Sequence, residues 1–127
     1  MTTVMDSSAI LAVLLDEPGA AAVAPRIPDS YLSAVNAAEI VSKLVDTGYS
    51  AEAAADRFGR LNARTIAFDE ETAIIAGQLR SLTRHLGLSL GDRACLALGI
   101  RERATVITAD RSWAELDLPC KVELIRQ

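Results

Sequence analysis

The sequence contains little cysteine and histidine. It has two cysteines, Cys95 and Cys120, and one histidine, His85. The cysteines are far apart and lack metal-ligand spacing, so we expect core thiols rather than a disulfide or a zinc site. We assign His85 no catalytic role, which leaves general-base work to a carboxylate or to metal-bound water.

The sequence also lacks a membrane span and a signal peptide. The longest purely aliphatic run covers residues 9–15, which is too short to cross a bilayer. The first residues, MTTVMD, place no basic region ahead of an apolar segment, as a signal peptide would require. We therefore predict a soluble, cytoplasmic protein with no membrane partner.

Aromatic residues make up only 4% of the 127 residues, whereas 50% of the residues are hydrophobic. Aliphatic side chains must therefore fill the core, which suits an α/β architecture with helices on both faces of a sheet. The length suits a single domain, residues 1–127. Such a domain buries roughly two-thirds of its unfolded surface, enough for a substantial core.

An excess of positive charge is absent too, since the net charge is −4. This balance argues at first against a nucleic-acid partner. However, nine of the thirteen basic residues lie from Arg64 onward, and eleven of the thirteen are arginine, whose planar fork suits phosphate. Most of these arginines are expected to solvate helix faces.

Hydrophobic periodicity and turn residues predict alternating strands and helices. The predicted strands are residues 2–5, 31–33, 65–68, 104–108 and 122–125. The predicted helices are residues 7–15, 20–26, 34–46, 50–61 and 69–82, then a helix opened by Ser89 and a helical turn at 112–116. This alternation implies a mostly parallel central sheet with right-handed crossovers.

Four carboxylates fall at corresponding places in this pattern. Asp6 follows the first strand, and Asp110 follows the fourth. Asp92 opens a helix as the acid of a capping box with Ser89, and Glu39 lies one turn into the helix after the second strand. Ligands of open parallel sheets bind at the carboxyl edge of the strands, so we expect the four acids to face one crevice.

Crowded carboxylates repel one another unless a cation joins them. Oxygen ligands with no histidine or cysteine nearby favour Mg²⁺, with Mn²⁺ also possible. Such an ion lowers the pKa of bound water and neutralises a phosphate, which is the chemistry of phosphodiester hydrolysis. Each acid also has a plainer role on spacing alone: Asp6 and Asp92 as helix caps, Glu39 as a solvated side chain, and Asp110 as a turn residue.

Four segments carry a family resemblance: VMDSSAILAVLLDEPG, SAVNAAEIVSKL, LSLGDRACLALG and VITADRSW. In their order and intervals the chain resembles the PIN-domain ribonucleases, specifically the VapC toxins of bacterial type II toxin–antitoxin pairs. The residues that match the family's metal-site acids are Asp6, Glu39, Asp92 and Asp110. The residues that match its supporting polar positions are Asn36 and Thr108.

The resemblance implies a PIN-like three-layer α/β fold and a magnesium-dependent endoribonuclease that acts as a toxin by cutting RNA. It also implies a cognate VapB-type antitoxin, which inserts a C-terminal segment across the active-site groove. Members of the family are commonly homodimers. In this chain we look for self-association on the helices between residues 34 and 61.

Several neighbouring residues are candidates for supporting roles. Ser7 and Thr108 can hydrogen-bond a carboxylate or a metal-bound water. Arg93 and Arg111 each directly follow one of the acids, so either can approach the substrate phosphate, and a role on the solvated surface is an equally good expectation for each. Trp113 can stack on a base, although a core position is the plainer expectation.

Two other functions stay open from the sequence. A receiver-like signalling domain suits the length and fold, but it needs an acidic pair after the first strand and a lysine after a late one. Here Ser7 and Ser8 follow Asp6, and the lysines are Lys43 and Lys121. A phosphatase of the haloacid-dehalogenase type needs Asp-x-Asp, which Ser8 interrupts. The non-enzymatic alternative is a catalytically inactive PIN fold that only binds a partner or RNA, against which the intact acidic set argues.

Overall fold

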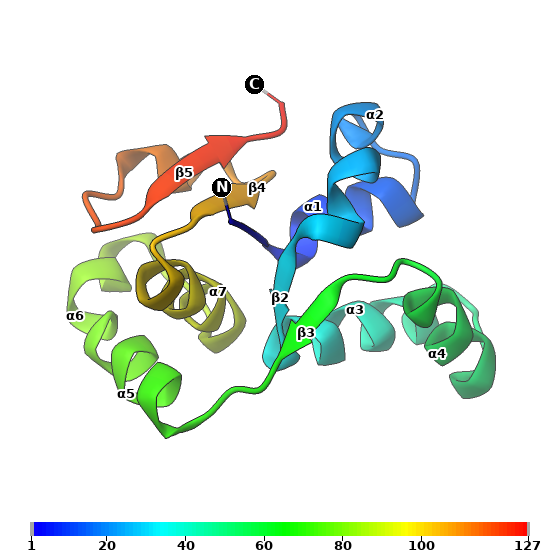
Figure 1. Ribbon diagram of the computed structural model, residues 1–127, viewed down its shortest axis with the longest axis horizontal. Coiled ribbons are helices and arrows are strands. Elements are labelled where there is room, and N and C mark those ends of the chain that lie inside the picture. Colours follow the sequence, from blue (N-terminus) through cyan, green and yellow to red (C-terminus); the bar gives the residue numbers. More distant parts are fainter. Residues whose placement is uncertain (1, 127) are drawn as a thin grey trace.

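A five-stranded parallel sheet forms the middle layer of the protein. The computed structural model describes residues 2–126. Its strands are β1 (Thr3–Met5), β2 (Tyr31–Ser33), β3 (Arg64–Ile66), β4 (Thr105–Thr108) and β5 (Lys121–Leu124). They lie in the order β3-β2-β1-β4-β5, and every neighbouring pair is parallel. The predicted parallel sheet is therefore confirmed, and Figure 1 shows its strands among the helices.

Helices connect these strands. They are α1 (Ser7–Leu14), α2 (Ala20–Val23), α3 (Ala34–Asp46), α4 (Ala51–Gly59), α5 (Glu70–Gln78), α6 (Arg80–Thr83) and α7 (Leu90–Glu102), with short 3-10 helices η1 (Ala24–Asp29), η2 (Arg84–Leu86) and η3 (Arg111–Glu115).

The sequence-based helix boundaries differ most from the structure at two places. The helix predicted over residues 20–26 ends at Val23, because Pro25 and Pro28 lack the backbone N–H groups that an α-helix needs, and η1 follows. The single helix predicted over residues 69–82 is divided into α5 and α6. The third strand, predicted over residues 65–68, ends two residues earlier, at Ile66.

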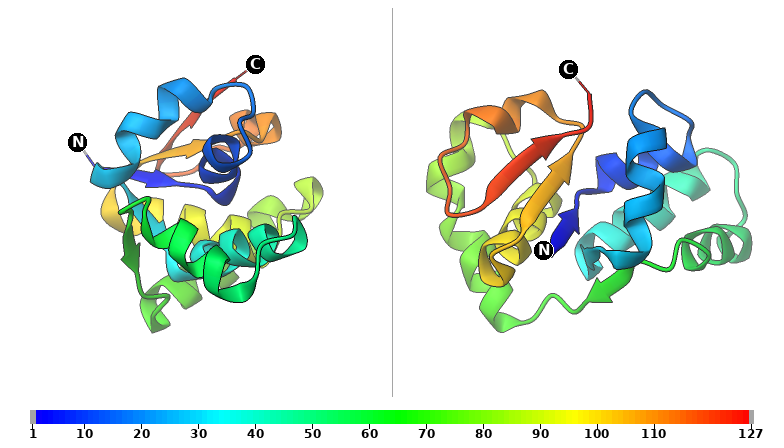
Figure 2. Two further views of the ribbon diagram at one scale, coloured as in Figure 1. Left: turned by 90° about the vertical axis from the view of Figure 1, so that its right-hand side faces the viewer. Right: turned by 45° about the horizontal axis from the view of Figure 1, so that its top comes forward.

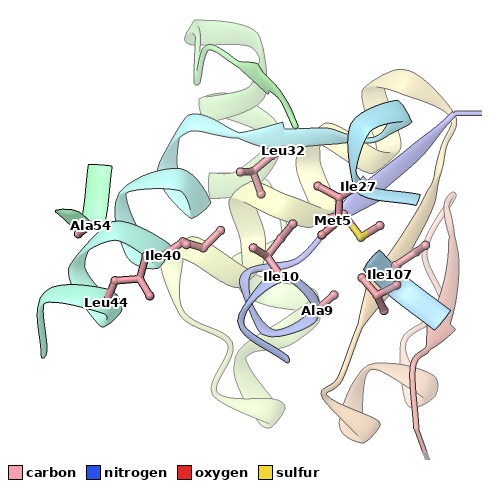
Figure 3. Close-up of a cluster of buried hydrophobic side chains, with 10 residues drawn as sticks. Met5, Ala9, Ile10, Ile27, Leu32, Ile40, Leu44, Ala54 and Ile107 are labelled. Carbon is pink, nitrogen blue, oxygen red and sulfur yellow. The ribbon is translucent and has the colours of Figure 1, made fainter. Parts of the chain in front are cut away.

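Helices cover both faces of the sheet, as predicted. Alternate strand residues point to opposite faces. Met5 therefore joins one core cluster with residues of α1, η1 and α3 (Figure 3), whereas Val4 joins a second cluster with residues of α7. Accordingly, α2 and α7 lie on opposite sides of the sheet (Figure 2). Trp113 is fully buried in the second cluster, which confirms its core position.

The two cysteines are free thiols. Cys95 is buried and Cys120 is half-buried. Burial raises the pKa of both thiols, as in structural rather than reactive cysteines. Among residues 2–126, the structure has no helix both long and apolar enough to cross a membrane.

The strand order creates a switch point between β1 and β4. The chain adds β2 and β3 on one side of β1, and then crosses over to add β4 and β5 on the other side. Ligands of open α/β sheets bind at such switch points, outside the carboxyl ends of the strands. The order also differs from the 2-1-3-4-5 order of receiver domains, so the receiver-like alternative is wrong.

Candidate active site

A pocket of about 350 Å³ opens at this switch point. Asp6 directly follows β1, and Asp110 comes two residues after β4. Glu39 lies on α3, and Asp92 lies in the first turn of α7. The structure therefore brings the four carboxylates singled out in the sequence to one pocket, whose lining is Asp6, Ser7, Ser8, Leu11, Glu39, Lys43, Asp92 and Asp110.

Asp6 is the most deeply placed of the four acids, with only 4% of its surface exposed. It occupies the position before α1, but its side chain makes no capping hydrogen bond. Instead, its Oδ2 accepts hydrogen bonds from Ser8 Oγ at 2.6 Å and from Thr108 Oγ1 at 2.9 Å. Thr108 Oγ1 accepts in turn from the backbone N–H of Asp110 at 3.0 Å. One hydroxyl at the end of β4 thus links two of the acids.

Glu39 is exposed to the pocket but held in place. Its Oε1 accepts hydrogen bonds from Ser7 Oγ at 2.6 Å and from Asn36 Nδ2 at 2.9 Å. Asn36, one turn earlier on α3, also donates to the carbonyl of Gly91 at 3.1 Å. These contacts connect α3 to the first turns of α1 and α7.

Asp92 and Asp110 each accept local hydrogen bonds at a helix start and also line the pocket. The capping box predicted for α7 is present: Asp92 Oδ2 accepts from the Ser89 N–H at 2.9 Å, and Ser89 Oγ accepts from the Asp92 N–H at 3.1 Å. Asp110 Oδ1 accepts from the N–H and the hydroxyl of Ser112 at the start of η3. In each of the four acids, these hydrogen bonds all reach the same carboxylate oxygen.

The pocket concentrates negative charge. Burial, with a smaller contribution from the Asp92 charge, raises the pKa of Asp6 from its ordinary 3.8 to about 6. Burial also raises the pKa of Asp92, and the charges of Glu39 and Asp110 add to that effect. Within residues 2–126, none of the four carboxylates forms an ion pair.

The donor chemistry of this pocket fits a hard divalent cation. All four acids offer oxygen, no histidine or cysteine lines the pocket, and none of the four is ion-paired with another described residue. The side chains are not arranged as a closed ligand shell, however. In the described part of the chain, no three His, Cys, Asp or Glu residues form a group that could hold a metal ion. Each carboxylate is instead turned toward its hydrogen-bond donors within the protein.

The two arginines predicted to approach phosphate do not line the pocket. Arg93 Nη1 donates to the carbonyl of Ala76 on α5 at 3.0 Å, so its guanidinium points to the helix layer rather than to the acids. Arg93 therefore does not contribute to the pocket lining in this structure, and its approach to a substrate phosphate stays a prediction. Arg111 is exposed outside the lining residues. The cation that does line the pocket is Lys43, which sequence reasoning missed.

The sequence positions of Lys43 and Ser8 relative to the acids could have identified both as pocket residues. Lys43 lies four residues after Glu39 on the same helix, a spacing that places both on one face. Ser8 follows Asp6 by two residues, and its hydroxyl accepts from the N–H of Ala109 at 2.9 Å while donating to Asp6. It therefore connects the end of β1 to the loop after β4.

Fold and site together define an α/β protein with an acidic pocket at the switch point of a parallel sheet. The PIN domain family model matches residues 3–118. The chain therefore belongs to the PIN domain family. Comparison with the curated proteins found no match.

Solved structures of the same fold come from several bacteria. A chain of VapBC2 from Rickettsia felis, bound to a DNA fragment from its promoter, has a TM-score of 0.75 at 15% identity, covering 97% of this chain and 98% of that one. FitAcB from Neisseria gonorrhoeae has a TM-score of 0.68 at 24% identity, covering 97% of both chains. VapBC-5 from Mycobacterium tuberculosis, a member of the VapBC family of toxin–antitoxin systems, has a TM-score of 0.60 at 23% identity. The match covers 99% of this chain and 98% of that one. At these identities the comparison establishes the shared fold.

Proposed function

We propose that this protein is an endoribonuclease and the toxin of a toxin–antitoxin pair. It hydrolyses RNA phosphodiester bonds with Mg²⁺, or Mn²⁺ in its place, bound in the acidic pocket. The observation that carries the proposal is the convergence of four carboxylates, without ion-pair partners among the described residues, on one pocket at the sheet's switch point. The PIN domain match supports nuclease chemistry.

The residues that would hold the cation are Asp6, Glu39, Asp92 and Asp110. A bound divalent ion supplies activation of water and neutralisation of phosphate charge. The protein contributes orientation: Ser8 and Thr108 fix Asp6 through hydrogen bonds. No histidine lines the pocket, and we assign Lys43 to the substrate, so we assign proton transfer to or from the protein to a carboxylate.

Lys43 is the residue we assign to the substrate phosphate. It is exposed, it lines the acidic pocket, and it forms no ion pair within residues 2–126. Its ammonium is therefore free to meet the RNA backbone beside the acids. Arg93 and Arg111 stay candidates for contacts with the same phosphate backbone farther from the acids.

The partner we propose is a VapB-type antitoxin. Support comes from the structural neighbours, which include VapBC and FitAB complexes. For a homodimer, the surface we propose lies on α3, α4 and the loop between them, where Val45 of α3 and Tyr49 of the loop are 43% and 37% exposed. Apolar exposure at two positions so close in the sequence suits burial by another chain.

The test is cleavage of labelled RNA by the purified protein with Mg²⁺, with Mn²⁺ and with EDTA. We expect cleavage only with metal, and we expect Asp6→Asn and Asp92→Asn to abolish it. Asp46→Asn is the matched control, because Asp46 is exposed at the end of α3 and does not line the pocket. Equal cleavage by the wild type and both pocket variants would defeat the proposal. Metal-independent RNA binding without cleavage would favour the inactive binding module.

A further inference from the structure

Glu39 is an exposed residue of α3, yet its carboxylate is fixed from three sides. Ser7 and Asn36 both donate to Oε1, and Gly91 on α7 lies against the whole carboxylate group. An exposed glutamate ordinarily samples several rotamers, and the entropy lost on fixing one of them opposes a single side-chain position. The fold therefore contains a specific arrangement that holds this one side chain.

Gly91 provides the space for that arrangement. A Cβ at position 91 would lie 2.6 Å from Glu39 Oε1 and closer still to Oε2. Cβ atoms in proteins do not approach other heavy atoms so closely, so either the carboxylate or α7 would have to move. Gly91 also belongs to the first turn of α7, where the helix dipole favours a nearby negative charge.

Asn36 provides the connection. Its side chain is 0% exposed, and its Nδ2 donates both to Glu39 Oε1 and to the Gly91 carbonyl, at 2.9 Å and 3.1 Å. Its Oδ1 is buried, and no hydrogen bond reaches it from the described residues. A buried amide oxygen without a partner is unfavourable. The orientation of Asn36 is thus governed by the bridge that its nitrogen makes between α3 and α7.

We infer that Asn36 and Gly91 are positioning residues that fix the Glu39 carboxylate beside Asp92, and that this spacing sets the affinity of the pocket for a divalent cation. Asp92 is the residue next to Gly91, so a contact that seats Glu39 on Gly91 also determines its place relative to Asp92. The part that concerns the cation rests on the proposed function. The part that concerns the seating of Glu39 is a property of the fold.

The seating is tested without metal by a double-mutant cycle in EDTA. Gly91→Ala should lower the melting temperature in the wild-type background and should not lower it in a Glu39→Ala background, where the obstructing carboxylate is gone. Gly77→Ala is the matched control, since Gly77 is a glycine of α5 with no heavy atom within 4 Å of its added Cβ. An equal loss in both backgrounds, or no loss in either, would overturn the inference.

The consequence for the cation is tested by titrating Mn²⁺ into the folded variants. Gly91→Ala and Asn36→Ala should weaken Mn²⁺ binding about 10- to 100-fold, as when outer partners of metal ligands are removed, whereas Gly77→Ala should not. Unchanged affinity in Gly91→Ala refutes the link to the cation. The wild type could bind no Mn²⁺ while the coupling between Gly91 and Glu39 persists. In that case the proposed function and the link to cation affinity are both refuted, and the positioning of Glu39 by Gly91 is retained. If Mn²⁺ binding and RNA cleavage are intact but the coupling is absent, the inference fails alone.

Discussion

Asp6→Asn is expected to stabilise the metal-free protein at neutral pH. Asp6 is almost completely buried, and burial raises its pKa from 3.8 to about 6. One pKa unit corresponds to about 1.4 kcal/mol. Ionised Asp6 therefore costs the folded state about 3 kcal/mol at neutral pH. Asparagine keeps a similar shape and an oxygen for Ser8 and Thr108, but it carries no charge.

The sign of the pH dependence follows from the two pKa values. Because the pKa is higher in the folded state than in the unfolded state, the stability that Asp6 contributes is fully present below about pH 4 and is lost as the pH rises through about 6. The difference in unfolding free energy between Asp6→Asn and the wild type should therefore be largest above about pH 7 and should shrink toward about pH 4.

The assay is urea unfolding of both proteins in EDTA across this pH range. Comparing the two proteins at each pH removes the contribution of the other titrating groups. Asp69→Asn is the control of opposite sign, because hydrogen bonds from the N–H and hydroxyl of Thr72 lower the pKa of Asp69. That variant should lose stability at neutral pH. If Asp6→Asn is less stable than the wild type at neutral pH, or its advantage does not change with pH, the reasoning is refuted.

Three further predictions concern metal and substrate. Mg²⁺ or Mn²⁺ should raise the melting temperature of the wild type but not that of Asp6→Asn. At about a 100-fold excess of the ion over its Kd, the gain in the unfolding free energy of the wild type is about 2.7 kcal/mol. Calorimetry that shows no shift for the wild type would contradict a preformed site. Thr108→Val removes a hydrogen bond to Asp6 and should lower kcat at least about 10-fold in steady-state cleavage, whereas full activity would contradict its role. Lys43→Ala should raise KM and reduce the salt slope of binding by about 1, while Arg93→Leu should leave both unchanged because the Arg93 guanidinium already donates to the Ala76 carbonyl; the reverse pattern would favour Arg93 as the phosphate contact.

The secondary structure can be predicted largely from local signals. Helix α3 has the boundaries expected from the sequence, because Ser33 and the apolar positions define it clearly. The capping box of α7 is visible as Ser89 and Asp92. The break between α5 and α6 is harder to predict in this way, because Leu79 and Leu82 continue the apolar pattern beyond Gly77 and Gln78.

The assembly of the pocket depends on contacts between distant parts of the chain. Whether Asp6 and Asp110 meet depends on β4 pairing with β1, as in the register of Met5 with Ile107. That pairing crosses about a hundred positions of the chain, and no local pattern encodes it. The long side chain of Arg93 is harder still to place from the sequence, because its sequence neighbour lines the pocket while its guanidinium reaches the Ala76 carbonyl behind it.

An acid of this pocket can have a structural role and a functional role at the same time. The acid without a capping role therefore indicates function most clearly. Asp92 caps α7 and also lines the pocket, so its capping bond alone explains its presence. Asp110 likewise accepts from Ser112 in η3. Asp6 makes no capping bond, and its ionised form is disfavoured by burial. Because its ionised form is disfavoured by burial, Asp6 is the acid that points most directly to the cation of the proposed function.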